Sequence, residues 1–159
     1  MSFDTDIVIA GGGLNGPTLA LALAGAGLSV TVVDPRPAGY RTGEDFDGRA
    51  YALALASQRL LSALGLWGDL AGVSQPVRQV KASQGQPGEG AARFLLHFDS
   101  AEIEEGPVGH MLEDRFLYRA LLAAMAGRVT HLAGLSVEGQ EPDASGIAVR
   151  LSGGRSLRA

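Results

Sequence analysis

The chain has 159 residues, of which 46% are hydrophobic and 19% are charged, a balance that excludes a disordered chain and predicts roughly one folded domain. Its formal net charge of −4 and pI near 5.3 do not indicate a nucleic-acid partner. Because it has no cysteine, disulfides, thiolate chemistry and cysteine-ligated zinc are excluded, and no metal site is expected.

The N-terminal part of the chain has the pattern of a βαβ unit. Residues 6–10 form a short apolar run that glycines follow at once, which is typical of a buried parallel strand. Residues 14–26 are rich in leucine and alanine, with Pro17 in the first turn and Gly25 near the end, and predict a buried helix. Residues 28–34 are β-branched and predict a second strand.

A glycine motif, G-x-G-x-x-G, connects the first strand to the helix. Its first glycine permits a tight turn, its second lets a pyrophosphate approach the backbone, and its third lets the helix pack close to the strands. The helix N-terminus then offers N–H groups and a partial positive charge to the phosphates. The cofactor-binding residues expected in this segment are Gly11, Gly13, Leu14, Asn15 and Gly16.

Asp34 ends the second strand, 18 residues after Gly16. At that place its carboxylate can accept hydrogen bonds from the adenosine ribose hydroxyls, and its charge opposes a bound 2′-phosphate. A glycine-rich turn without a ligand is the alternative, but the order of strand, motif, helix, strand and acid favours dinucleotide binding.

The remainder of the chain interrupts this unit. A charged loop, a helix and an antiparallel-looking hairpin come before the next strand, whereas an NAD dehydrogenase usually continues with another helix and parallel strand. The interruption therefore favours a flavoprotein. The expected elements are a loop at 35–49, a helix at 53–64, strands at 77–83 and 92–98, a helix at 114–126, a strand at 129–133, and two final hairpin-like strands around 142–143 and 152–154.

Longer motifs carry a resemblance to a known family. They are Asp-Gly-Arg-Ala-Tyr-Ala-Leu at 47–53, Leu-Gly-Leu-Trp at 64–67 and Gly-His-Met-Leu-Glu-Asp-Arg at 109–115, with Ser57, Leu61, Leu117, Ala120 and Leu121. With the glycine motif and Asp34, they make the chain similar to the ubiquinone-biosynthesis hydroxylases, UbiH-like flavin-dependent aromatic monooxygenases.

The resemblance implies an α/β fold, in which a Rossmann-type FAD-binding domain is interrupted by part of a β-rich substrate domain. Residues 1–72 would be the FAD-binding segment, 73–112 part of the substrate-domain sheet, and 113–159 the return to the FAD-binding domain. The match ends before segments that family members carry later, so we expect an N-terminal fragment that is truncated before the rest of the fold and is inactive alone.

The resemblance also implies the chemistry. FAD would be reduced by NAD(P)H, and O2 would supply the oxygen that hydroxylates a phenolic ubiquinone precursor. Arg49 would lie against the flavin or its phosphates, and Arg115 would reach the ribityl–pyrophosphate region, with surface ion pairs to Asp47 and Asp114 as the alternative. Arg36 is expected to cover the adenine.

Other interpretations stay open from the sequence. One is another FAD enzyme of the same fold, such as a halogenase or a prenyl reductase. The other is a non-catalytic flavin-binding or assembly module of a biosynthetic complex. No catalytic acid–base pair is predicted. The acidic N-terminus and the short apolar stretch at 19–33 indicate neither a signal peptide nor a membrane span, so we expect a cytoplasmic protein, with peripheral membrane or complex association left open.

Overall fold

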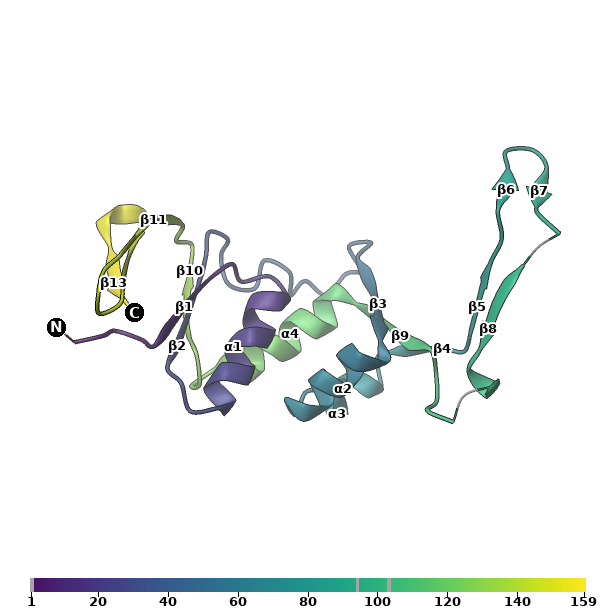
Figure 1. Cartoon of the computed structure of the whole chain (residues 1–159), viewed down its shortest axis with the longest axis horizontal. Coiled ribbons are helices and arrows are strands. Elements are labelled where there is room, and N and C mark those ends of the chain that lie inside the picture. Colours follow the sequence, from purple (N-terminus) through teal and green to yellow (C-terminus); the bar gives the residue numbers. More distant parts are fainter. Residues whose placement is uncertain (1, 94, 103) are drawn as a thin grey trace. The chain divides into compact units, whose positions relative to one another are not determined.

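The computed structural model describes residues 2–93, 95–102 and 104–159. It contains two compact units, which are treated one at a time below. The first unit combines Met1–Asp47 with Arg115–Ala159, and the second unit is Gly48–Asp114. The second unit is thus inserted into the chain of the first, as the colours along the sequence show in Figure 1.

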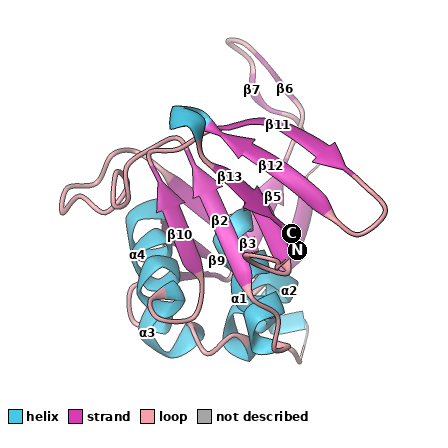
Figure 2. Cartoon of the chain, turned by 90° about the vertical axis from the view of Figure 1, so that its left-hand side faces the viewer, coloured by secondary structure: helices cyan, strands magenta, loops and turns pink. Residues whose placement is uncertain are grey.

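A parallel sheet forms the centre of the first unit. Its order is β1 (Ile7–Ala10), β2 (Val30–Asp34) and β10 (Thr130–Ala133), so β2 lies in the middle. Helix α1 (Asn15–Gly25) packs against β1 and β2, and α4 (Asp114–Met125) lies on the same side of the sheet (Figure 2). The expected βαβ unit, the helix after residue 114 and the later parallel strand are therefore confirmed.

The middle strand β2 is buried along its whole length because both faces of the sheet are covered. On the helix side, Val32 is fully buried, as are Ala20 and Leu21 of α1. On the other side, Val33 packs with Val149 and Leu151 into a second apolar cluster. A continuous run of β-branched residues is what a strand buried on two faces requires.

The second face of this sheet is covered by an antiparallel meander at the C-terminal end of the chain (Figure 2). It consists of β11 (Val137–Pro142), β12 (Ile147–Leu151) and β13 (Ser156–Arg158). The sequence predicted two strands here, and the structure has three. The additional reversal is made at Gly153 and Gly154, whose φ angles of +73° and +75° favour glycine.

The first residues of the chain are tied to β13. The Asp4 N–H donates to the Arg158 carbonyl at 2.9 Å, and the Arg158 N–H donates to Asp4 Oδ2 at 2.8 Å. The Arg158 Nη2 atom lies 2.6 Å from each carboxylate oxygen of Asp143 and 2.8 Å from Ser145 Oγ. One arginine therefore joins the N-terminal segment, the last strand and the turn between β11 and β12.

The second unit is built on an antiparallel sheet with β9 (Gly109–Glu113) in the middle. Strands β3 (Ala50–Ala54) and β4 (Gln75–Val77) pair with its two edges. The unit also contains helices α2 (Leu55–Ala63) and α3 (Trp67–Ala71). Its buried core comprises Leu61, Leu66, Leu70 and Leu112.

The sequence predicted a helix at 53–64, but the observed helix α2 begins two residues later, at Leu55. Leu53 and Ala54 belong to β3, where they pair with His110 and Gly109 of β9, and the helix begins only at Leu55. The sequence analysis did not predict β3 or β9. Each strand is short, and its pairing partner lies about 60 residues away, so a local apolar pattern cannot reveal the pairing.

The second unit also contains a hairpin that forms a sheet of its own. Strand β5 (Gln79–Ala82) pairs with β8 (Leu96–Asp99), and the short strands β6 (Gly85–Gln86) and β7 (Gly90–Ala91) pair near its tip. A single 3-10 turn (Ser100–Glu102) follows β8. The hairpin strands pair with each other and not with β1 or β2, as expected.

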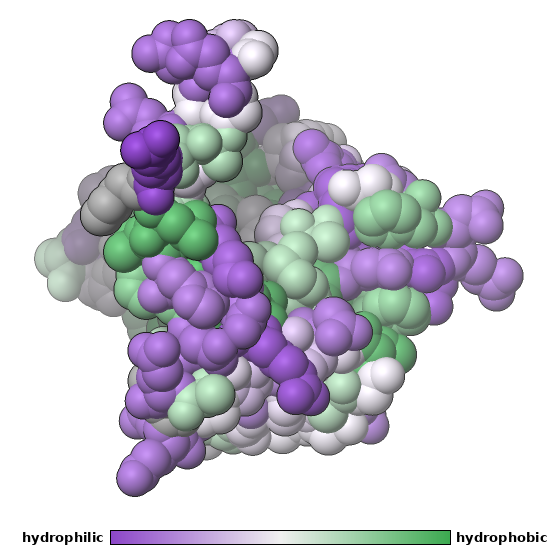
Figure 3. Space-filling view, turned by 90° about the vertical axis from the view of Figure 1, so that its right-hand side faces the viewer, coloured by the Kyte–Doolittle hydropathy of each residue, from purple (hydrophilic) through white to green (hydrophobic). Residues whose placement is uncertain are grey.

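One face of the hairpin is apolar and the other is polar. The cross-strand pairs Val80–Phe98 and Ala82–Leu96 alternate with Gln79–Asp99 and Lys81–His97. Val80, Leu96 and Phe98 are exposed, and Figure 3 shows apolar atoms at the surface among polar ones on this side of the molecule.

The two compact units meet in the chain after Asp47 and after Asp114. The expected segments 1–72, 73–112 and 113–159 have other boundaries. Residues 48–72 cluster with the hairpin and β9, and not with the βαβ unit. The functional assignment of the three segments stays a prediction. Within the part of the chain that the structure describes, no helix has both the length and the apolar character needed to cross a membrane.

We expect Arg158→Ala to lower the thermal midpoint of unfolding near neutral pH. The hydrogen bond from Arg158, followed by those from Ser145, holds the pKa of the Asp143 carboxyl well below its usual 3.8. A carboxylate with a depressed pKa stabilises the fold above its unfolded-state pKa, and this contribution is lost as the pH falls. The difference between wild type and variant, measured by calorimetry, should therefore shrink below about pH 4.

Arg150→Ala is the matched control. The Arg150 Nε atom lies 3.5 Å from Glu141 Oε1, and both side chains are more than half exposed, so this ion pair contributes little. Equal midpoint shifts for the two variants would contradict the structural role assigned to Arg158.

Candidate functional site

The turn from β1 into α1 is made by Gly11. Its φ of +115° lies in the region that favours glycine, and its N–H donates to the Val33 carbonyl at 2.7 Å. The turn therefore leaves the carboxyl end of β1 beside the carboxyl end of β2. Ligands of open α/β sheets bind outside the carboxyl ends of the strands.

Close contact between helix and strand explains Gly16. A Cβ atom at this position would lie 1.9 Å from the Gly11 carbonyl oxygen and 3.5 Å from Ile9 Cγ2. Any larger residue would push the first turn of α1 away from the turn that precedes it. This is the packing role that the motif assigns to its third glycine.

Gly13 has a different environment from its neighbours. A Cβ atom built on it would meet no protein atom within 4 Å, so nothing in the described chain requires a glycine there. The adjoining start of α1 has no side-chain cap and no acidic residue in its first turn. The N–H groups at this end of the helix therefore have no side-chain cap, and the positive end of a helix favours an anionic group such as a pyrophosphate.

Asp34 lies at the end of β2 and is only 7% exposed. Its Oδ2 accepts the Gly12 N–H at 2.6 Å, and its Oδ1 accepts the Arg36 N–H at 2.8 Å. Each carboxylate oxygen can accept a further hydrogen bond. The carboxylate therefore has capacity left for the hydroxyl groups of a ribose.

The Arg36 side chain folds back onto Tyr40. Its Nη1 donates to Tyr40 Oη at 2.8 Å, and its guanidinium carbon lies 4.7 Å from the centre of the Tyr40 ring. The Tyr40 ring in turn meets Tyr118 edge to face at 5.7 Å, and the Arg41 guanidinium lies within 6 Å of both rings. The expected contact of Arg36 with an adenine stays a prediction.

Arg119 of α4 holds the loop that contains Tyr40. Its Nε and Nη2 donate to the Thr42 carbonyl at 3.0 and 2.6 Å, and Nη2 also donates to the Gly43 carbonyl at 2.7 Å.

The sequence analysis missed Gly12, Tyr40 and Arg119. Only Gly12 had a local signal, as the middle residue of three consecutive glycines.

Arg49 and Arg115 lie in different compact units. Arg49 precedes β3, and its carbonyl accepts the Asp114 N–H at 3.0 Å. Arg115 is in the first turn of α4, with its guanidinium carbon 4.6 Å from the centre of the Phe116 ring. The roles expected for both arginines stay predictions.

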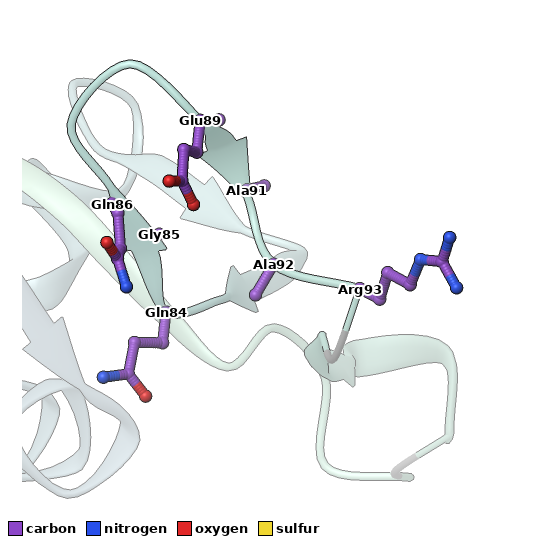
Figure 4. Close-up of a pocket in the computed structure, with 8 residues that line it drawn as sticks. Gln84, Gly85, Gln86, Glu89, Ala91, Ala92 and Arg93 are labelled. Carbon is purple, nitrogen blue, oxygen red and sulfur yellow. The ribbon is translucent and has the colours of Figure 1, made fainter.

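A concave surface of about 520 Å³ lies at the tip of the hairpin (Figure 4). The polar and charged residues that line it are Gln84, Gln86, Glu89 and Arg93. None of the site residues expected from the sequence lines this surface. It lies on the two-stranded tip of the hairpin, between β6 and β7.

Two proteins of known name are similar to this chain in sequence. It is 40% identical to the ubiquinone hydroxylase UbiL of Rhodospirillum rubrum over 157 residues, which is 97% of this chain and 35% of that protein. It is 33% identical to the 3-demethoxyubiquinol 3-hydroxylase of Escherichia coli over 123 residues, which is 76% of this chain and 30% of that protein. The chain therefore spans about a third of the length of these relatives.

A solved structure shares the fold. The crystal structure of PqsL from Pseudomonas aeruginosa in complex with 2-aminobenzoylacetate superposes with a TM-score of 0.74 at 26% identity. The superposition covers 97% of this chain and 40% of PqsL. The family model described as an FAD binding domain matches residues 4–150, which is nearly the whole chain. The chain therefore belongs to the FAD binding domain family.

Proposed function

We propose that the glycine turn, the start of α1 and Asp34 hold the ADP half of FAD. The observation that carries this proposal is Gly13, which has no steric reason within the described chain to be a glycine. It lies beside an uncapped helix N-terminus, where an anion is favoured. The membership of the chain in the FAD binding domain family supports the same ligand.

Each residue has a distinct role in this proposal. Gly13 leaves room for the pyrophosphate, and the N–H groups at the start of α1 donate to it. Asp34 accepts from the adenosine ribose hydroxyls, with its orientation set by two main-chain donors. Arg36, Arg49 and Arg115 supply guanidinium groups toward the adenine, the flavin and the phosphates, as the family resemblance implies.

We further propose that the protein that carries this chain is an aromatic-ring monooxygenase. The two relatives named above are a ubiquinone hydroxylase and a 3-demethoxyubiquinol 3-hydroxylase, and the resemblance of the motifs points to the same kind of reaction. When bound, FAD supplies the redox chemistry that activates dioxygen. The residues of this chain bind and orient the cofactor. We propose NAD(P)H as the reductant and a phenolic ubiquinone precursor as the substrate.

Two alternatives predict different measurements. Another FAD oxidoreductase, such as a halogenase or a prenyl reductase, would oxidise or reduce a different substrate but still bind FAD. A non-catalytic flavin module would bind FAD without substrate-dependent oxidation of NAD(P)H. Product analysis with candidate phenols distinguishes the first alternative, and NAD(P)H oxidation distinguishes the second.

Asp34→Ala in the complete gene product is expected to weaken FAD binding. Loss of a charge-assisted hydrogen bond costs about 1.5–3 kcal/mol, which corresponds to roughly tenfold to hundredfold in the dissociation constant. Fluorescence titration of the apoprotein with FAD measures the effect. Asp6→Ala is the control. The Asp6 carboxylate also accepts a main-chain N–H, from Ser29, but Asp6 precedes β1 and so lies at the amino ends of the strands, away from Asp34. Equal affinities for Asp34→Ala and wild type would contradict the assigned ribose contact.

Gly13→Val is expected to abolish FAD binding and leave the fold intact. The added carbon atoms enter space that no protein atom occupies within 4 Å of the Cβ position, so the apoprotein tolerates them. The pyrophosphate would lose the same space. Far-ultraviolet circular dichroism checks the fold, and the flavin absorbance of the purified protein reports the cofactor. A normally folded variant with a full complement of FAD would show that the phosphates lie elsewhere.

Residues 1–159 expressed alone are expected to bind FAD weakly and to show no hydroxylation. Among the described residues, β1 pairs only with β2, so its other edge has unpaired main-chain groups that favour association with another chain. Size-exclusion chromatography, flavin absorbance and NAD(P)H oxidation test this expectation. A soluble monomer with stoichiometric FAD and turnover would refute it.

A further inference from the structure

We propose that Gly12 is a positioning residue for the adenosine ribose, although the pattern G-x-G-x-x-G leaves its identity free. It would act through Asp34, in two ways. Its N–H fixes one carboxylate oxygen, and its missing side chain leaves room for the carboxylate to approach. This inference rests on the proposed binding of the ADP half of FAD.

The backbone of Gly12 does not itself require a glycine. Its φ angle is not among the positive ones, in contrast to Gly11, so an L-residue fits the local conformation. A Cβ atom at Gly12 would, however, lie 2.8 Å from Asp34 Cβ, 3.2 Å from Cγ and 3.1 Å from Oδ2. The demand for a glycine therefore comes from Asp34, across the sheet edge, and not from the turn.

This contact determines the orientation of the carboxylate. The Gly12 N–H holds Oδ2 at 2.6 Å, and the Arg36 N–H holds Oδ1 at 2.8 Å, so each oxygen has one main-chain donor. Asp34 is 7% exposed and has little room to move without losing one of these bonds. A side chain at Gly12 would displace the Asp34 Cβ and Cγ atoms, and the ribose would lose a prepositioned acceptor.

The neighbouring glycine supplies a matched control. Neither Gly12 nor Gly13 has a positive φ, but of the two only Gly12 would place a Cβ within 4 Å of a protein atom. Gly12→Ala should therefore disturb Asp34 in the apoprotein. Gly13→Ala should disturb only a bound pyrophosphate.

The test is a double-mutant cycle on FAD affinity in the complete gene product. Asp34→Gly removes both the carboxylate and the Cβ atom that a residue at 12 would meet. We expect Gly12→Ala to weaken FAD binding about tenfold in wild type and to have no further effect in the Asp34→Gly background. Gly13→Ala should weaken binding equally in both backgrounds. An equal effect of Gly12→Ala in both backgrounds, or none in wild type, would overturn the proposal.

A flavin-independent readout uses ADP and 2′,3′-dideoxy-ADP as probes in isothermal titration calorimetry. Wild type and Gly13→Ala should prefer ADP, whereas Gly12→Ala should bind the two probes with similar affinity. A preference for ADP that Gly12→Ala retains would overturn the role of Gly12.

A folding measurement covers the case in which Gly12→Ala does not fold. Recovery of the fold in the double variant Gly12→Ala/Asp34→Gly would then support the steric contact. If the single and the double variant both fail to fold while Gly13→Ala folds, the steric contact is overturned.

These outcomes are distinguishable from failure of the proposed function. If Asp34→Ala and Gly13→Val both leave FAD affinity unchanged, the ADP site itself is misplaced. If those two variants weaken binding but Gly12→Ala does not, the ADP site stands and only the positioning role of Gly12 is wrong.

Discussion

The buried carboxylate of Asp34 connects the parts of the site that the chain brings together. A negative charge at a buried position is stable only when hydrogen-bond donors replace the water it has lost. Two main-chain N–H groups do so here, one from the glycine turn after β1 and one from the loop after β2. The same two bonds hold the turn, the strand end and the loop in one arrangement.

The layers of the first unit make this arrangement rigid. Strand β2 is covered by α1 on one face and by the C-terminal meander on the other, so its end has little freedom. Helix α1 can approach only because Gly16 has no side chain to meet the Gly11 carbonyl. Close packing on both faces thus turns a short apolar strand into a fixed support for an acidic side chain.

The loop after β2 is long but has internal attachments. Arg36 stacks on Tyr40, Tyr40 contacts Tyr118, and Arg119 donates three hydrogen bonds to carbonyls of Thr42 and Gly43. Tyr118 and Arg119 belong to α4, which comes about 80 residues later in the chain. The loop next to the proposed adenosine site is therefore held by a helix that follows the inserted unit in the chain.

Local patterns in the sequence determined the βαβ unit, the glycine turn and the place of Asp34, because strand burial, helix punctuation and glycine turns leave signals within a few residues. They did not reveal β3 and β9, the third strand of the meander, or the contacts of Tyr40 and Arg119, whose partners lie far away in the chain. The need for a glycine at position 12 was also decided by tertiary structure. Its φ is not positive, so the turn itself does not demand a glycine, and the approach of Asp34 from the neighbouring strand leaves no room for a side chain.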